Sequence, residues 1–451
     1  MEQTKSNQID MTQGSPAKLI LRFSLPLLLG NLFQQLYNMV DSVVVGRFVG
    51  KTALAAVGTA FPVVFLMSSL FMGLGIGAMV MVSQFFGAGD EKRLRATVDT
   101  IYTALMVGIV PLTLLGVFLA KPIMDLLAVP ADTYDQCWQY MVIVMGGLIG
   151  SLGYNANSGI LQGFGDSKTP LLFLSIACGI NIVLDLLFVV VFHWGTMGVA
   201  IATVAAQCFS WIFGVFYINK KYPQIAIRPL SFRFDKPLFG KIIRLGVPAG
   251  IQQALFSVGV MTMQRLVNGA GSTFMAGFNG ANKLDTFAFM PIQSFTNAVT
   301  TFVGQNIGAG KPERVHKGTV ATMWISCIFS AVAAVFLLLC GPWLMRMFST
   351  DPGVIDAGMA YLNRVMPFYW LLAISFVFNS VMRGAGEMTV PMISSIVGLW
   401  LARVPAAYLL THFFGANNMH FCYAIGWVVG LCITIPVYAS GRWKRKSVTG
   451  L

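Results

Sequence analysis

The sequence predicts an all-α membrane protein of twelve transmembrane helices, arranged as two six-helix lobes related by a parallel internal repeat. Three observations predict this class: an apolar composition, apolar stretches of spanning length, and duplicated motifs. Of the 451 residues, 56% are hydrophobic and 10% are charged, against about 45–50% and 25% in an average soluble protein. So few charges could not cover a soluble protein of this size, and the same composition excludes a disordered chain.

Twelve apolar stretches are long enough to span a bilayer as helices, which takes about 20 residues each. They are too long and too uniformly apolar for the strands of a closed barrel, the other backbone that lipid tolerates. The predicted spans are 18–45, 53–84, 96–119, 137–162, 170–192, 196–219, 239–267, 274–303, 316–340, 357–382, 389–411 and 419–441. Because they use most of the chain, they leave no room for a soluble domain.

The connections between the spans predict the orientation of the chain. The even-numbered connections and the termini hold 22 of the 30 Lys and Arg residues, and the odd-numbered connections hold five. Basic residues gather on the cytoplasmic side, so both termini are predicted to be cytoplasmic in a multi-pass plasma-membrane protein. The predicted parts are an N-terminal tail at 1–17, a first lobe at 18–219, a linker at 220–238, a second lobe at 239–441 and a C-terminal tail at 442–451.

Composition and spacing also exclude several functions. The net charge of +13 lies mostly in short connections beside apolar stretches, as expected against an anionic leaflet, and no basic domain is present to bind nucleic acid. The seven Cys include no CxxC pair and the four His have no metal-ligand spacing, so no metal centre or disulfide framework is expected. The sequence shows no nucleotide-binding motif and no nucleophile–base pair, so we expect neither a cofactor nor an enzyme.

Two motifs recur at an offset of 221 residues, which indicates an internal duplication. The matching segments are VSQFFGAG at 82–89 and VGQNIGAG at 303–310, QGFGD at 162–166 and RGAGE at 383–387, Tyr140 and Tyr361, and, at 222, Pro26 and Pro248. Each half has an even number of spans, so both halves enter from the same side and the repeat is parallel. Parallel repeats of this kind are typical of transporters, with the substrate path between or within the halves.

Polar residues inside the spans are costly in lipid and are therefore candidates for function. Those that share a helix face are Gln34, Tyr37 and Asp41 on the first helix, Asn181 and Asp185 on the fifth, and Thr203 and Gln207 on the sixth. By the predicted orientation, Asp41, Asp185 and Thr203 all lie in the outer half of the bilayer. Two carboxyls, an amide and a hydroxyl can therefore meet at one depth in the first lobe.

The chemistry of such a pair of carboxyls is that of an ion-exchange site. Two desolvated carboxyls close together cannot both stay ionised, so one of them holds a proton. The same oxygens also suit a small hard cation such as Na⁺. In the absence of a nucleotide-binding motif, an inward gradient of H⁺ or Na⁺ is the expected source of energy.

The order and duplication of these motifs resemble the multidrug and toxic compound extrusion (MATE) transporters, over about residues 18 to 440. The segments that carry the resemblance are Pro26 with YNMVD at 37–41 and GRFVG at 46–50, and the two duplicated motifs. The resemblance implies a V-shaped pair of lobes that alternate access and export lipophilic organic cations in exchange for inward H⁺ or Na⁺. It also suggests a monomer surrounded by membrane lipids, with no obligate protein partner.

The resemblance further implies where the coupling ion binds. The matching positions are Asp41, Asn181, Asp185 and Thr203, with Asn157 or Asn155 of the fourth helix aligned less securely. The second half does not repeat the carboxyls, since the offset places Ala406 opposite Asp185. We therefore expect coupling in the first lobe, with no metal beyond Na⁺ at Asp41 and Asp185.

Substrate contacts and a hinge are predicted from residue type. Flexible Met and flat aromatic side chains suit varied lipophilic cations. The candidates are Gln34, Tyr37, Met39 and Asn157 beside a cavity, and Lys283 and Asp285 on the eighth helix, for which a structural ion-pair network is equally open. Pro26 removes a backbone hydrogen bond one turn before Gly30, which predicts either a hinge or an ordinary packing kink.

Two other transporter classes remain as alternatives. A flippase for lipids or lipid-linked oligosaccharides, from the same superfamily, would line its central cleft with basic residues, and Lys283, Arg364 and Arg403 lie inside spans. A major-facilitator carrier would show a G-x-x-x-D-R-x-G-R-like loop after the second helix. The segment from Gly87 to Arg93 resembles that loop only faintly.

Overall fold

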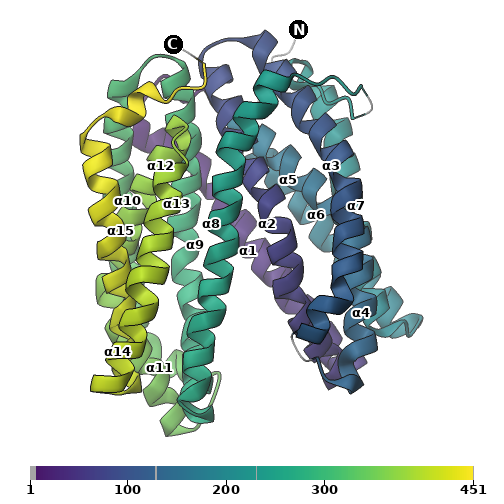
Figure 1. Ribbon diagram of the computed structural model, residues 1–451, viewed down its shortest axis with the longest axis vertical. Coiled ribbons are helices and arrows are strands. Elements are labelled where there is room, and N and C mark those ends of the chain that lie inside the picture. Colours follow the sequence, from purple (N-terminus) through teal and green to yellow (C-terminus); the bar gives the residue numbers. More distant parts are fainter. Residues whose placement is uncertain (1–6, 127–128, 230, 450–451) are drawn as a thin grey trace. The chain divides into compact units, whose positions relative to one another are not determined.

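The computed structural model describes residues 7–126, 129–229 and 231–449, and within these ranges it contains helices and no strand (Figure 1). The chain forms two compact units: the first comprises residues 7–10 and 25–251, and the second comprises residues 11–24 and 252–449. The all-α class predicted from composition is confirmed.

The first unit is built mainly from the first eight α-helices of the chain. They are α1 (Pro16–Val44) with the π-helical η1 (Val45–Val49), α2 (Lys51–Gly87), α3 (Glu91–Leu126), α4 (Ala131–Gly146), α5 (Leu148–Gly163), α6 (Lys168–Asp185) with the π-helical η2 (Leu186–Val191), α7 (Gly195–Lys221), the short η3 (Pro223–Ile225) and α8 (Lys236–Gly269). The start of α1 belongs to the second unit, and α8 passes from the first unit to the second after residue 251.

The second unit repeats this order. Its helices are α9 (Ser272–Gly308), α10 (Pro312–Arg346), α11 (Pro352–Val365), η4 (Met366–Phe368), α12 (Tyr369–Ala385), α13 (Thr389–Ile396), the π-helical η5 (Val397–Arg403), α14 (Val404–Phe414), η6 (Ala416–Phe421), α15 (Cys422–Ala439) and η7 (Arg442–Arg445). The starts of α2 and α9, of α3 and α10, of α4 and α11, and of α6 and α13 are each 221 residues apart. The structure thus repeats itself at the offset of the sequence motifs.

Each predicted span corresponds to one of these helices or helical runs, but the ends differ by up to seven residues, as where the span predicted at 96–119 is the helix Glu91–Leu126. In the described residues, nine helices are long and apolar enough to cross a membrane, or eleven if two pairs bent by 48° and 47° are each one span. The remaining predicted span, the eighth at 274–303, is present as α9, which is not among the eleven and carries Lys283 and Asp285. The predicted boundaries of the lobes and the linker stay predictions.

Both duplicated motifs lie at the C-terminal ends of helices, where their glycines terminate the helix. Gly89, Gly165, Gly310 and Gly386 have positive φ angles of 69°, 96°, 67° and 92°, a left-handed conformation that glycine adopts without steric cost. The next backbone N–H donates back to the helix, as from Asp90 to the Phe85 carbonyl oxygen at 3.1 Å. Such caps satisfy carbonyl groups that the helix end leaves free.

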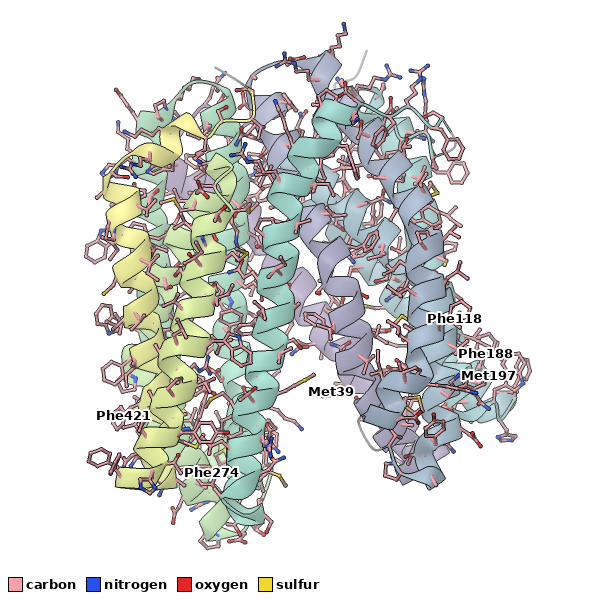
Figure 2. All side chains as sticks on the ribbon, viewed as in Figure 1. Met39, Phe118, Phe188, Met197, Phe274 and Phe421 are labelled. Atoms are coloured by element: carbon pink, nitrogen blue, oxygen red, sulfur yellow. The ribbon has the colours of Figure 1, made fainter. Side chains whose placement is uncertain are left out.

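The outward-facing surface of the helices is apolar. Phe118 on α3 is 75% exposed and points outward from the first unit (Figure 2), and Trp324, Leu339 and Trp343 on α10 are likewise exposed. In water, contiguous apolar surface of this kind would be an aggregation hazard. It is the surface expected of helices that face lipid, so the chain is a multi-pass membrane protein.

Candidate functional site

Helices α1 and α6 bring two carboxyl groups together inside the first unit. Asp41 lies one turn before the end of α1, Asp185 is the last residue of α6, and their carboxyl groups are close enough to interact directly. Asp185 is 0% exposed. Among the described residues, no donor forms a hydrogen bond with either carboxyl oxygen of Asp185 or with Oδ1 of Asp41.

Two buried carboxyls that lack a hydrogen-bond donor lower their energy by sharing one proton. Two charges in a low-dielectric interior repel strongly, and each loses its hydration. A single proton on either carboxyl removes one charge and turns the contact into a hydrogen bond. The pair is therefore suited to binding and releasing one proton or one small cation.

Hydroxyl and amide groups surround the pair. The Tyr37 hydroxyl donates to Thr203 Oγ1 of α7 at 3.4 Å, and the buried Asn181 lies one turn before Asp185 with its side-chain amide unpaired among the described residues. Tyr140 of α4 is buried near both carboxyls. The sequence did not single out Tyr140 for this site; its only signal was its repeat partner, Tyr361.

The backbone next to each carboxyl is irregular. The π-helical η2 begins directly after Asp185, and η1 begins four residues after Asp41. A π-turn inserts one extra residue into a helix, weakens its regular hydrogen bonding and is frequent at functional sites. Both carboxyls therefore lie at points where the helix can rearrange at lower cost than in a regular α-helix.

A hollow of about 370 Å³ opens beside the pair. Its lining includes Gln34, Tyr37, Tyr154, Asn181 and Gln207. Two of the predicted substrate contacts, Gln34 and Tyr37, thus face one cavity together with a residue of the carboxyl site. Met39 is not among the lining residues and is 59% exposed (Figure 2).

The asparagines of α5 lie elsewhere in the first unit. Asn157 is buried, accepts a hydrogen bond from the Tyr102 hydroxyl and donates to the Trp211 carbonyl oxygen at 3.1 Å. Trp211 is eight residues beyond Thr203 on α7, or about 12 Å along a helix. Asn155 donates to the Ser151 carbonyl oxygen and lines a different hollow. A role for either residue in ion coupling stays a prediction.

The second unit holds its own buried charge. Asp285 of α9 accepts hydrogen bonds from the hydroxyls of Tyr361 at 3.0 Å and Tyr369 at 2.5 Å, and the Arg403 guanidinium is near enough to attract it. Arg403 itself stacks 3.4 Å from the centre of the Tyr423 ring. Asp285 thus finds its partners on α11, α12 and the end of η5, in a network within the unit.

Two other basic residues predicted inside the spans of the second unit are Lys283 and Arg364, and they differ in their surroundings. Lys283 is exposed, with Nζ 5.8 Å from the centre of the Phe348 ring. Arg364 donates to Asn418 Oδ1 at 3.0 Å and to the Ala360 carbonyl oxygen at 3.1 Å. Substrate contact by Lys283 or Asp285 stays a prediction.

Removing one donor of the Asp285 network is expected to destabilise the second unit. Tyr369→Phe deletes a hydrogen bond to a buried charged group, which contributes roughly 1.5–3 kcal/mol. Thermal unfolding of the purified protein should show a clear drop in Tm. Tyr408→Phe is the matched control because the Tyr408 side chain is exposed. Equal Tm values for the two variants would show that the network contributes nothing measurable.

The predicted hinge lies within a continuous helix. α1 runs from Pro16 to Val44 and includes Pro26. A side chain at Gly30 would be in ordinary contact with Leu171 and Leu174 of α6. Bending at Pro26 stays a prediction.

Comparisons with known proteins agree with this architecture. A family model described as MatE matches the chain twice, over residues 26–187 and 248–409, so the matches begin 222 residues apart, at the paired prolines. The probable multidrug resistance protein YpnP of Bacillus subtilis is 30% identical over 437 residues, covering 96% of this chain and 97% of that protein. The probable multidrug resistance protein NorM of Thermotoga maritima is 26% identical, covering 96% and 94%.

A solved structure shares the fold. It is described as the outward-facing conformation of a multidrug resistance MATE family transporter of the MOP superfamily, and it superposes with a TM-score of 0.90 at 22% identity over 99% of each chain. A membrane protein in which one helical repeat occurs twice is typical of a transporter, and the family model matches both halves of this chain. The chain belongs to the MATE family, which the sequence motifs predicted.

Proposed function

We propose that the protein exports lipophilic organic cations across the plasma membrane in exchange for inward H⁺, with both termini in the cytoplasm. The observation that carries this proposal is the buried contact between Asp41 and Asp185, which lacks a donor among the described residues. A site that needs one proton for its own stability binds it from one side and releases it to the other when access changes. Na⁺ on the same oxygens is the alternative coupling ion.

The neighbouring hollow supports a cationic substrate. Tyr37 and Tyr154 offer aromatic faces, and Gln34 and Gln207 offer neutral polar groups. Aromatic faces attract organic cations, and the adjacent carboxyls add negative charge when they are deprotonated. A bound cation and a bound proton would then compete for the same negative charge, which is the thermodynamic requirement for exchange.

The names of the relatives support drug-like cargo, since YpnP and NorM are described as probable multidrug resistance proteins. A lipid flippase is less well supported. Of the three basic residues that this reading requires in a central cleft, Arg364 and Arg403 are engaged by Asn418 and by the Tyr423 ring, and only Lys283 is exposed. We propose a monomer that needs no cofactor and no protein partner.

Export of ethidium from proteoliposomes tests the function. The purified protein is reconstituted and loaded with ethidium, and a pH gradient and then a Na⁺ gradient are imposed separately. Export under the pH gradient alone is the expected result. Export under the Na⁺ gradient alone would keep the exporter and replace the ion. If neither gradient drives export and labelled lipids cross the bilayer instead, the proposal is wrong and a flippase is favoured.

A further inference from the structure

The connection between α7 and α8 is a basic and aromatic loop on the first unit. Arg228, Arg233 and Lys236 alternate along it with two phenylalanines. Phe232 is 58% exposed and Phe234 is 50% exposed. Basic and aromatic side chains together are the composition that favours the interface of an anionic membrane.

Two threonines of α3 anchor the last part of this loop, at Arg233 and Asp235. Thr103 Oγ1 donates to the Arg233 carbonyl oxygen at 2.9 Å, and Thr100 Oγ1 accepts from the Asp235 backbone N–H at 3.2 Å. Directly before these anchored residues, Phe232 has a φ of 46°, a left-handed conformation that is unusual for a bulky residue. Such a conformation persists only where the surrounding structure imposes it, so the loop presents its side chains in a defined arrangement.

The charges at this loop do not balance. Asp99 of α3 is buried, and Arg95, Arg228 and Arg233 are all near enough to attract it, although none of them forms an ion pair with it within the described residues. The charged side chains of the loop and the facing helix end are Arg95, Asp99, Arg228, Arg233, Asp235 and Lys236, which sum to +2. The site therefore attracts an anion.

An open surface hollow of about 880 Å³, a volume that includes adjoining solvent space, lies beside Arg228. It is lined by Met106 of α3, Trp211 of α7, and Arg228, Pro229 and Ser231 of the loop. Ser231 Oγ is buried and, among the described residues, has no hydrogen-bond partner. The hollow thus has an apolar floor with a cation and an unused hydroxyl at its rim.

An apolar stripe continues from this floor along the outside of α3. Val107, Val110 and Leu114 are exposed at i, i+3 and i+7, so they share one face of the helix. A ligand that binds the rim through its charge can lay a hydrocarbon chain along this stripe. A small soluble anion would leave both the floor and the stripe unused.

We propose that this hollow is a binding site for one anionic phospholipid of the cytoplasmic leaflet. The phosphate lies at Arg228 and Arg233 with Ser231 as a further donor, and an acyl chain packs on Met106 and Trp211. The site uses neither the carboxyl pair nor the hollow beside that pair. The proposal therefore does not depend on which substrate and coupling ion the transporter uses.

Native mass spectrometry of the full chain tests the site. The protein is released from detergent micelles containing phosphatidylglycerol or phosphatidylcholine, and bound lipids are counted as a function of lipid concentration. We expect one phosphatidylglycerol to bind more tightly than the rest, with no such step for phosphatidylcholine. R228Q/R233Q should weaken this step about 25-fold, about fivefold for each basic side chain at an anionic surface.

The matched control is K317Q/R442Q, which removes two exposed charges from the second unit, and it should bind as the wild type does. Equal phosphatidylglycerol binding by the wild type and R228Q/R233Q would overturn the proposal. So would displacement of the lipid by millimolar inorganic phosphate, which would indicate a site for free anions. If the double variant does not fold, the singles R228Q and R233Q must each weaken binding, and unchanged binding in both overturns the proposal.

Discussion

Asp185→Asn is expected to reduce gradient-driven ethidium export to the level of protein-free liposomes while leaving the protein folded. The amide has the shape of the carboxyl but cannot take up and release a proton, so the exchange cycle loses its ion. Its N–H can donate to Asp41 at any pH, so the folded state no longer has to take up a proton to avoid repulsion between two buried acids. We therefore expect unfolding to become harder by about 1 kcal/mol while transport is lost.

This opposite movement of stability and transport separates a coupling role from a structural one. Asp41→Asn should behave in the same way, because either substitution leaves a single acid at the site. Asp356→Asn is the matched control, since Asp356 is exposed on α11, and it should export at the wild-type rate. Export by Asp185→Asn at the wild-type rate, in protein that is correctly inserted, would exclude the carboxyl pair as the coupling site.

The fold was predictable because lipid imposes simple rules on sequence. A span must be long and apolar, so the helices could be located from composition alone. The repeat was visible for a different reason: Gly89 and Gly310 both cap helices with a positive φ, and a side chain at either position would be strained. What survived duplication most clearly was therefore the helix ends.

The carboxyl site was predictable only in part. A carboxyl in a membrane span is costly enough to be noticed in any sequence, and helical spacing placed Asp41 and Asp185 at one depth. Tyr140 escaped prediction because a tyrosine costs little in an apolar stretch and spacing does not tell which helix it faces. The hydrogen bonds of Asn157 to Tyr102 and Trp211 depend on the packing of three helices, which a single sequence does not encode locally.

The hydrogen-bond network around Asp285 was harder to predict from the sequence than the carboxyl site. The sequence showed that Asp285 needed a partner, and the structure supplies two tyrosines and an arginine from three other segments. Tyr361 is the repeat partner of Tyr140, and both lie near buried acids. The duplicated position thus holds a tyrosine in both units, while the neighbouring acids lie on helices that do not correspond in the repeat.

The crossing of α2 and α8 in the first unit leads to the second large prediction. A side chain on Gly73 would place its first carbon 2.3 Å from the Gly250 nitrogen and 2.4 Å from the Gly246 oxygen. Both are backbone atoms, so no side chain can turn away to make room. Gly73→Ala therefore forces the two helices apart, and small residues at such crossings are what allows close helix packing in a membrane.

Gly75→Ala is the control two residues away on α2, where a side chain would meet no heavy atom within 4 Å. There alanine should stabilise by about 0.5–1 kcal/mol, because glycine is the poorer helix former. Gly73→Ala should instead destabilise by about 3 kcal/mol, the upper end for overpacking, since α8 must leave α2. Thermal unfolding in one detergent would therefore move Tm in opposite directions for the same chemical change. Equal shifts would mean that α2 and α8 do not cross at these glycines.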